Sequence, residues 1–182
     1  MIVVTGAART GTSLAMQTLG LLSIDLVPAA FSKEHEGSEE FNPKGFYDMV
    51  GPEALAGVHH DNYRGKAVKL FAMGLHRTPA EFVDAVLVCR RDKAKAIDSL
   101  MRIQKFLFDA ETKKPVDKEQ VEKIFDSSYI VIEDWVKKGG KPSMSIQFED
   151  MVSDPVSGVE GLAAFLDLDV DTWPAIDNVE RG

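Results

Sequence analysis

Two glycines and a hydroxyl near the start of the chain have the spacing of a phosphate-binding loop. Four residues separate Gly6 from Gly11, and Ser13 stands where such a loop places its hydroxyl. A nucleotide hydrolase carries lysine at the position that Thr12 holds here, and the nearest cation is Arg9, inside the loop. The loop therefore predicts binding of a phosphate or phosphosulfate group that does not belong to a nucleoside triphosphate.

The segments on either side of this loop are of the type that the motif requires. Residues 2–4 are an apolar run that predicts a buried strand, and a helical pattern covers residues 14–22, with the helix beginning near Thr12. The first N–H groups of a helix and the positive end of its dipole bind an anion without metal. The alternative is a plain strand–turn–helix with an accidental glycine spacing, but the position directly after a strand favours the anion site.

A guanidinium and a hydroxyl follow a second apolar run. Residues 85–89 predict a strand, Arg91 stands just after it, and a helix is expected from Asp92. Ser99 lies about two turns into that helix. Together Arg91 and Ser99 could hold a second phosphate, whereas alone they would be a solvated arginine and an exposed serine.

The elements that must position these groups alternate between strands and helices. This pattern predicts an α/β domain of the P-loop type, with three layers in which helices flank a mostly parallel central sheet. We expect one domain over residues 1–182, with its site at the carboxyl ends of the strands. Further strands are predicted at 66–71, 85–89 and 143–148 (the last near an edge), with a shorter one at 24–27. Helices are predicted at 92–110, over an apolar stripe at 121–136 that Gly139-Gly140 ends, and at 155–168.

A long polar segment interrupts this alternation. Residues 31–51 are irregular and rich in charge, and residues 52–60 predict a short helix. Loops of this length in a compact domain are usually functional or disordered. We expect residues 31–60 to form a flap that faces the substrate.

Composition excludes several classes of protein. The net charge of −8 argues against a nucleic-acid partner, although Arg9, Arg90 and Arg91 could form a local basic pocket. The single cysteine, Cys89, rules out an intrachain disulfide and is expected to be buried and inert. No run approaches the ~20 apolar residues of a membrane span, and no cleavable signal is recognised, so we expect a cytoplasmic protein.

The ordered motifs resemble those of one family, the sulfotransferases. Residues 8–14 resemble its 5′-phosphosulfate loop, and Arg91 with Ser99 matches its 3′-phosphate motif. Residues 42–48 look like the Asn-Pro-Lys-Gly segment of bacterial members. The late matches are Phe148-Glu149-Asp150, Asp154-Pro155 and Phe165-Leu166.

The resemblance implies in-line transfer of a sulfuryl group from 3′-phosphoadenosine 5′-phosphosulfate to a hydroxyl or amine of a small acceptor, without metal. The loop would hold the 5′-phosphosulfate and the second pair the 3′-phosphate, because fixed N–H donors and cations stabilise the charged migrating group. Lys69 matches a lysine near the bridging oxygen and the acceptor, although a strand-end lysine directed to solvent is the alternative. The implied donor-binding residues are Arg9, Thr10, Gly11, Thr12, Ser13, Arg91 and Ser99.

The general base is less clearly indicated. Cytosolic members of the family place histidine two residues after the lysine, where this chain has Phe71. Asp48, at the end of the matched segment, is the first choice, although the family more often has Glu there. His59-His60-Asp61 lacks the third distant ligand that a metal site needs. The remaining candidate bases are Glu39, Glu40, His59 and His60.

Three functions compete. The first is a sulfotransferase that acts on a sugar, metabolite or lipid head group. The second is a nucleotide or small-molecule kinase with an aberrant loop, which Thr12 in place of lysine disfavours. The third is a catalytically inactive nucleotide-binding relative, favoured by Phe71 and by the carboxyl end, where only Arg181 stands in place of the basic, glycine-rich segment of larger members.

Overall fold

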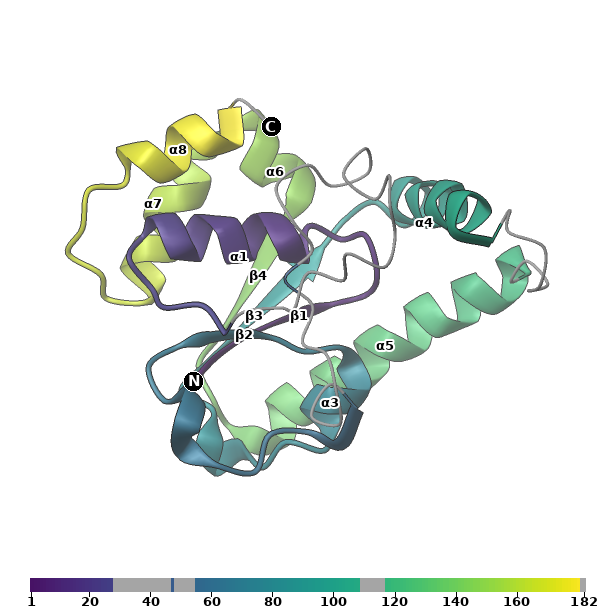
Figure 1. Cartoon of the computed structure of the whole chain (residues 1–182), viewed down its shortest axis with the longest axis horizontal. Helices are drawn as coiled ribbons and strands as arrows, with labels where there is room; N and C mark the ends of the chain where they lie inside the picture. The colour runs from purple at the N-terminus through teal and green to yellow at the C-terminus, as the bar shows by residue number, and fades with distance from the viewer. Residues whose placement is uncertain (28–46, 48–54, 109–116, 181–182) are drawn as a thin grey trace.

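Helices cover both faces of a parallel sheet (Figure 1). The computed structural model describes residues 1–27, 47, 55–108 and 117–180, and for residues 104–108 only the helical backbone. The predicted α/β class is confirmed.

The sheet of the described residues has the strand order β2-β1-β3-β4, and every neighbouring pair is parallel. The two central strands, β1 and β3, are almost continuously apolar and buried, as expected where helices cover both faces. β4 lies at an edge and is the more exposed strand, as its composition predicts. The strands are β1 (Ile2–Gly6), β2 (Ala67–Lys69), β3 (Ala85–Arg90) and β4 (Ser143–Gln147).

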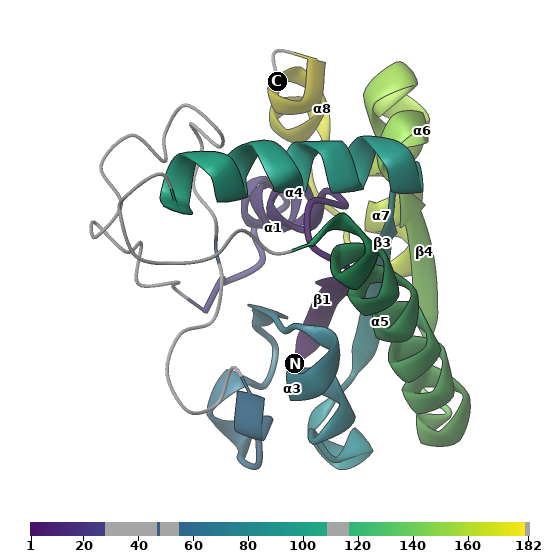
Figure 2. The same cartoon turned by 90° about the vertical axis from the view of Figure 1, so that its right-hand side faces the viewer.

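The helices divide between the two faces of the sheet. Figures 1 and 2 show α1, α6, α7 and α8 on one face and α3 and α5 on the other, with α4 crossing near the carboxyl ends of the strands. The helices are α1 (Thr12–Leu21), α3 (Ala72–His76), α4 (Lys93–Phe108), α5 (Lys118–Gly139), α6 (Phe148–Ser153), α7 (Pro155–Phe165) and α8 (Trp173–Glu180), and the short 3-10 helices are η2 (Asp61–Tyr63) and η3 (Ala80–Phe82).

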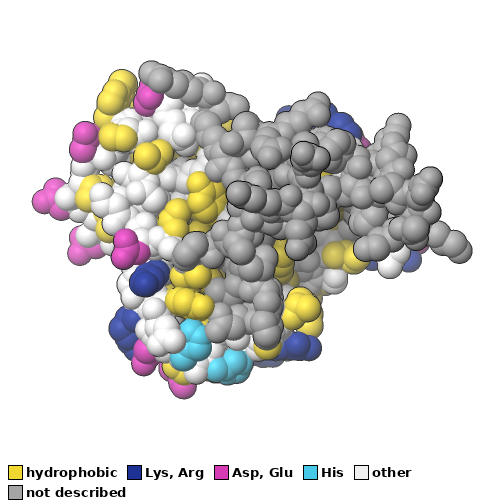
Figure 3. Space-filling view, in the orientation of Figure 1, with side chains coloured by type: hydrophobic (Ala, Val, Ile, Leu, Met, Phe, Trp, Pro, Cys, Tyr) yellow, Lys and Arg dark blue, Asp and Glu magenta, His cyan; other side chains and the backbone are white. Residues whose placement is uncertain are grey.

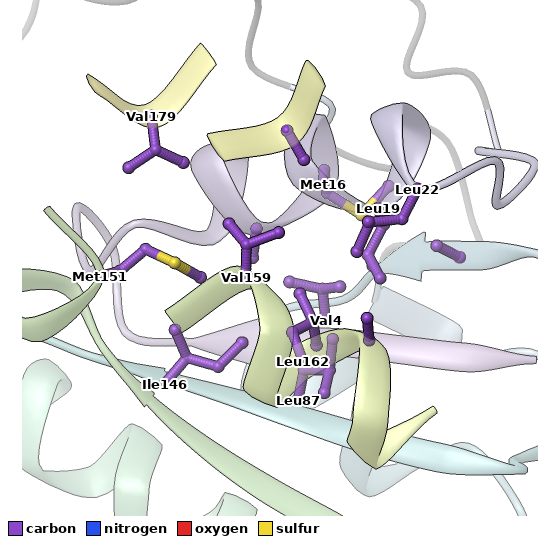
Figure 4. Packing of buried hydrophobic residues seen from close by; sticks show 14 of the residues in the cluster. Val4, Met16, Leu19, Leu22, Leu87, Ile146, Met151, Val159, Leu162 and Val179 are labelled. Atoms are coloured by element: carbon purple, nitrogen blue, oxygen red, sulfur yellow. The ribbon is translucent and has the colours of Figure 1, made fainter. Parts of the chain in front are cut away.

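The core is divided in the same way. Val4 packs with Leu19 and Leu162 under α1 and α7 (Figure 4), whereas Val3 packs with Trp135 on the side of α5. Consecutive residues of a strand point to opposite faces, so the apolar run of β1 fills both halves of the core. This two-sided burial fixes β1, and with it the start of the loop that follows.

Several predicted elements differ from the structure. The strand expected at 24–27 is reduced to an isolated bridge between Leu26 and Ala67. The helix expected over 52–60 is wrong at its end: of its described residues only Leu55 and Ala56 are helical, and Gly57 takes a left-handed φ of +83°. Ile124, expected on the inward stripe of its helix, is 55% exposed.

Other differences concern extent. Helices α3, α6 and α8 were not predicted, because short helices carry too few apolar repeats to reveal a period. Most of the predicted flap at 31–60 and the end of the predicted 92–110 helix lie outside the described residues.

Acidic side chains gather where α7, α8 and their connection lie (Figure 3). Within the described ranges, none of the helices combines the length and apolar character of a membrane span.

Candidate functional site

The loop between β1 and α1 makes a left-handed turn directly before the helix. Gly11 immediately precedes α1 with a left-handed φ of +92°, and Arg9 is also left-handed at +67°. A Cβ atom at Gly11 would lie 2.7 Å from Cδ2 of Phe148. Gly11 offers no side-chain cap, so α1 begins as helix-start anion sites do. The glycine is thus required both by the turn and by the close approach of Phe148.

The inner side of the loop is held by its own hydroxyl. Thr10 is 1% exposed, and its Oγ1 donates to the carbonyl of Ala7 at 2.7 Å. A Cβ atom at Gly6 would lie 2.6 Å from both Thr10 Oγ1 and the carbonyl oxygen of Cys89. The side chain of Thr10 therefore stabilises the turn.

The structure brings Arg9 of the loop close to Arg91 and Ser99, the predicted 3′-phosphate pair. Arg9 Nε donates to Ser99 Oγ at 3.0 Å, and Arg91 Nη1 donates to the carbonyl of Arg9 at 3.2 Å. Ser99 is buried, at 7% exposure, so the exposed serine considered as an alternative is wrong. The Arg91 side chain thus contacts the loop backbone, and the Arg9 side chain connects the loop to α4.

Arg91 is positioned by α6. Its Cζ lies 4.3 Å from the ring centroid of Phe148, and its Nε is 3.9 Å from Glu149 Oε1. That Nε is buried without a hydrogen-bond acceptor in the described structure, which is rare for a guanidinium. The stacking holds the side chain at the loop while leaving hydrogen-bonding capacity for an anion.

Glu149 fixes the segment that carries Arg91. Its carboxylate accepts from the backbone N–H of Asp92 at 3.3 Å and from Gln147 Nε2 at 2.8 Å. Burial opposes ionisation of Glu149, but these hydrogen bonds outweigh it and hold its pKa below the usual value. Glu149 and Asp150 lie in the first turn of α6. The sequence motif contained Phe148 and Glu149, but it gave no sign of their contact with Arg91.

Lys69 lies at the end of β2 and turns toward the loop. It is only 8% exposed, and its Nζ donates to Ser13 Oγ at 3.2 Å. The alternative of a solvent-directed lysine is therefore wrong. A buried ammonium is costly unless it is hydrogen-bonded, and here it adds positive charge at the start of α1.

Arg90 does not join the basic pocket expected from the sequence. Its Nη2 bonds Glu133 at 2.6 Å, and its guanidinium lies over the ring of Tyr129, with Cζ 4.7 Å from the centroid. Both partners belong to α5, on the opposite face of the sheet from Phe148. Among the described residues, Arg91 contacts the loop backbone and Lys69 bonds Ser13 at the start of α1, while Arg9 belongs to the loop itself.

The candidate bases are only partly described. Asp48, Glu39 and Glu40 lie outside the described residues. His59 Nε2 lies 3.1 Å from the carbonyl of Ala56, and His60 Nδ1 accepts from the N–H of Asn62. Over the described ranges, no three His, Cys, Asp or Glu residues cluster as metal ligands.

Comparison with known proteins gives structural matches alone. No protein-family model matches the sequence, and no curated protein matches it. The sulfotransferase domain from the curacin biosynthetic pathway superposes with a TM-score of 0.59 at 17% identity, covering 100% of this chain and 78% of that one. This chain has the fold of a sulfotransferase domain.

A second similar structure is retinol dehydratase in complex with androsterone and the inactive cofactor PAP. It superposes with a TM-score of 0.58 at 14% identity over 99% of this chain. This chain covers 63% of the length of that protein. The fold thus agrees with the family that the ordered motifs resemble.

Proposed function

We propose that the protein is a sulfotransferase that uses 3′-phosphoadenosine 5′-phosphosulfate and releases the 3′,5′-bisphosphate. The observation that carries the proposal is that Arg9, Arg91 and Lys69 each lie in, or bond to, the loop before α1 or the first turn of α1. Three cations beside one helix start suit a ligand with two separate anionic groups. The likeness to a sulfotransferase domain and to a protein crystallised with PAP supports this reading.

The residues present fit such a donor. Arg9 and the N–H groups of Thr10, Gly11, Thr12 and Ser13 would hold the 5′-phosphosulfate. Arg91 and Ser99 would hold the 3′-phosphate, with the unbonded Nε of Arg91 as a ready donor. These groups are fixed by packing, so they need little rearrangement as charge develops.

In the proposed transfer the acceptor oxygen forms a bond to sulfur while the bond from sulfur to the 5′-phosphate oxygen breaks. The acceptor proton passes to a base, and the bisphosphate leaves. Lys69, held by Ser13, would stabilise negative charge on the leaving oxygen. No metal is required by this scheme.

For the base we propose Asp48, which ends the segment that resembles bacterial members. Replacement by asparagine keeps the shape and removes the basicity. We expect Asp48→Asn to depress transfer to a small acceptor while leaving affinity for the bisphosphate unchanged. Full transfer activity in this variant would move the base to Glu39, Glu40, His59 or His60.

Calorimetry tests the proposed ligand directly. The purified chain is titrated with 3′-phosphoadenosine 5′-phosphate and, separately, with ATP and magnesium. Tight binding of the bisphosphate with a weak response to ATP–magnesium is the expected result. The reverse order of affinities would favour the kinase, and bisphosphate binding without transfer to any acceptor would favour an inactive relative.

A further inference from the structure

An apolar pocket of about 200 Å³ lies between α4 and α5, beside the loop. Ala7 and Ala8 of the loop form one wall, and Leu100 of α4 lies on another. Ala8 directly precedes Arg9, and Leu100 directly follows Ser99, whose side chain is bonded to Arg9. The pocket therefore adjoins the loop that carries Arg9 and the helix that carries Ser99.

The described lining offers almost no hydrogen-bonding side chain. Ser128 of α5 has the single polar side chain among the described lining residues, and its Oγ donates to the carbonyl of Ile124 at 2.7 Å. The others are aliphatic, with one aromatic ring from Phe125. A group that enters deeply must accordingly be apolar, because a buried hydroxyl without a partner is costly.

The volume limits the size of that group. An engineered apolar cavity of about 150 Å³ holds a benzene molecule. A pocket of about 200 Å³ thus has room for one six-membered ring with a small substituent. A sugar ring of similar size would bury several hydroxyls against Leu100 and Phe125.

We propose that this pocket binds the apolar body of the sulfuryl acceptor, with the acceptor hydroxyl directed out of the pocket toward Arg9. The inference rests on the proposed function and narrows its acceptor to small phenols and alcohols of comparable bulk. It selects against sugars, which the sequence alone leaves open.

Two neighbouring serines of α5 provide matched variants. Ser128 lines the pocket, whereas Ser127 is exposed and absent from the lining, and both donate to the carbonyl of Ile124. Binding of 4-methylphenol is measured by ligand-observed NMR with saturating bisphosphate. Ser128→Leu is expected to raise the Kd for the phenol about tenfold or more, because the added side chain fills part of the pocket. Ser127→Leu is expected to leave that Kd unchanged. Affinity for the bisphosphate should be the same in both variants.

Several outcomes would overturn the proposal. The proposal is wrong if both variants bind the phenol equally well, or if the unaltered protein does not bind it. It is also wrong if glucose binds with the same affinity as the phenol. Weakened bisphosphate binding in Ser128→Leu would assign the pocket to the nucleotide base instead. If Ser128→Leu does not fold, Ile124→Ser is used in its place, because Ile124 is a half-exposed residue of the lining. This variant is also expected to raise the Kd for the phenol.

The phenol titration is repeated without bisphosphate. One outcome is that the protein binds the phenol, in a way that Ser128→Leu weakens, and yet shows no affinity for the bisphosphate. That result would keep the pocket as an apolar ligand site and refute the proposed sulfotransferase function. Failure of the pocket and failure of the proposed function are thus read separately.

Discussion

Arg90 and Arg91 are neighbours in sequence but lie in two different regions of the molecule. Arg90 packs on the α5 side, where Glu133 neutralises it and Tyr129 supports it. Arg91 lies on the loop side, where Phe148 supports it and its Nε keeps an unused N–H. In both regions an aromatic ring holds a guanidinium, but only the loop side joins it to a helix start and to further cations. A cation therefore indicates a candidate ligand site only through the groups that surround it.

The largest effect on stability and binding should come from adding a side chain to the glycine turn before α1. Gly11→Ala adds a Cβ atom to a residue with left-handed backbone conformation. That atom would lie 2.7 Å from Cδ2 of Phe148. We expect the free energy of unfolding to fall by about 2–4 kcal/mol and bisphosphate binding to be lost. Thermal unfolding and calorimetry measure the two effects.

Gly65 is the matched control, because its φ is +73° and nothing lies within 4 Å of an added Cβ. Gly65→Ala should cost only about 1–2 kcal/mol from backbone strain and leave bisphosphate affinity intact. Equal losses of binding in the two variants would show that the contact with Phe148 is irrelevant to the site.

The next effect separates the two arginines. Arg91→Ala should weaken bisphosphate binding by about 1.5–3 kcal/mol, the range for hydrogen bonds that involve charged groups. Arg90→Ala, which removes an equal charge from the α5 side, should change it by less than about 0.5 kcal/mol. Calorimetry on both variants decides between local recognition and a general effect of net charge, and equal losses would contradict the assigned role of Arg91.

A smaller effect isolates the support that α6 gives to Arg91. Phe148→Leu keeps an apolar side chain but removes the ring face 4.3 Å from the guanidinium. We expect bisphosphate affinity to fall by about 0.5–2 kcal/mol, the range for cation–π contacts. Phe148→Tyr, which keeps the face, should restore it. If leucine performs as well as the aromatic residues, the ring does not position Arg91.

The smallest effect concerns Cys89, directly before the arginine pair. Burial raises the pKa of this thiol from its usual value near 9 to about 12, partly offset by the charge of Lys69. Because the folded pKa is raised, this group should not affect stability below pH 9, and stability should fall as pH rises from 9 toward 12.

Mass spectrometry after iodoacetamide treatment checks the burial of the Cys89 thiol, which is the cause of its raised pKa. The native chain should remain unmodified at pH 8, whereas the urea-unfolded chain should react. Rapid modification of the native chain would show that β3 opens readily and that the region around both arginines is not rigid.

The local architecture of the site was predictable from sequence. The strand–loop–helix at the start follows from an apolar run, two spaced glycines and a helical pattern within about twenty residues. The end of α5 was equally predictable, since Gly140 takes the left-handed conformation that closes a helix. The identities of Arg91, Ser99 and Lys69 were recognised, but their roles remain proposals.

The surroundings of those residues were not predictable. The basic pocket of three arginines was wrong because backbone direction at the end of β3 sends Arg90 to the α5 side and Arg91 to the loop. The sequence left a solvent-directed Lys69 open as an alternative, and only the packing of β2 beside β1 shows it bonded to Ser13, 56 residues away. Helix α6, which supports Arg91, is too short for its periodicity to reveal it.

Local signals in the amino-acid sequence were enough to predict the apolar strands, the glycine turn, the longer amphipathic helices and the buried cysteine. Tertiary structure decided which distant side chains meet, including the Arg9–Ser99 bond across 90 residues, the ring beneath Arg91 and the pocket between α4 and α5. The physical reason is that periodicity and turn chemistry act between near neighbours along the chain. Contacts across the sheet depend on strand order and helix packing, which no short stretch of residues specifies.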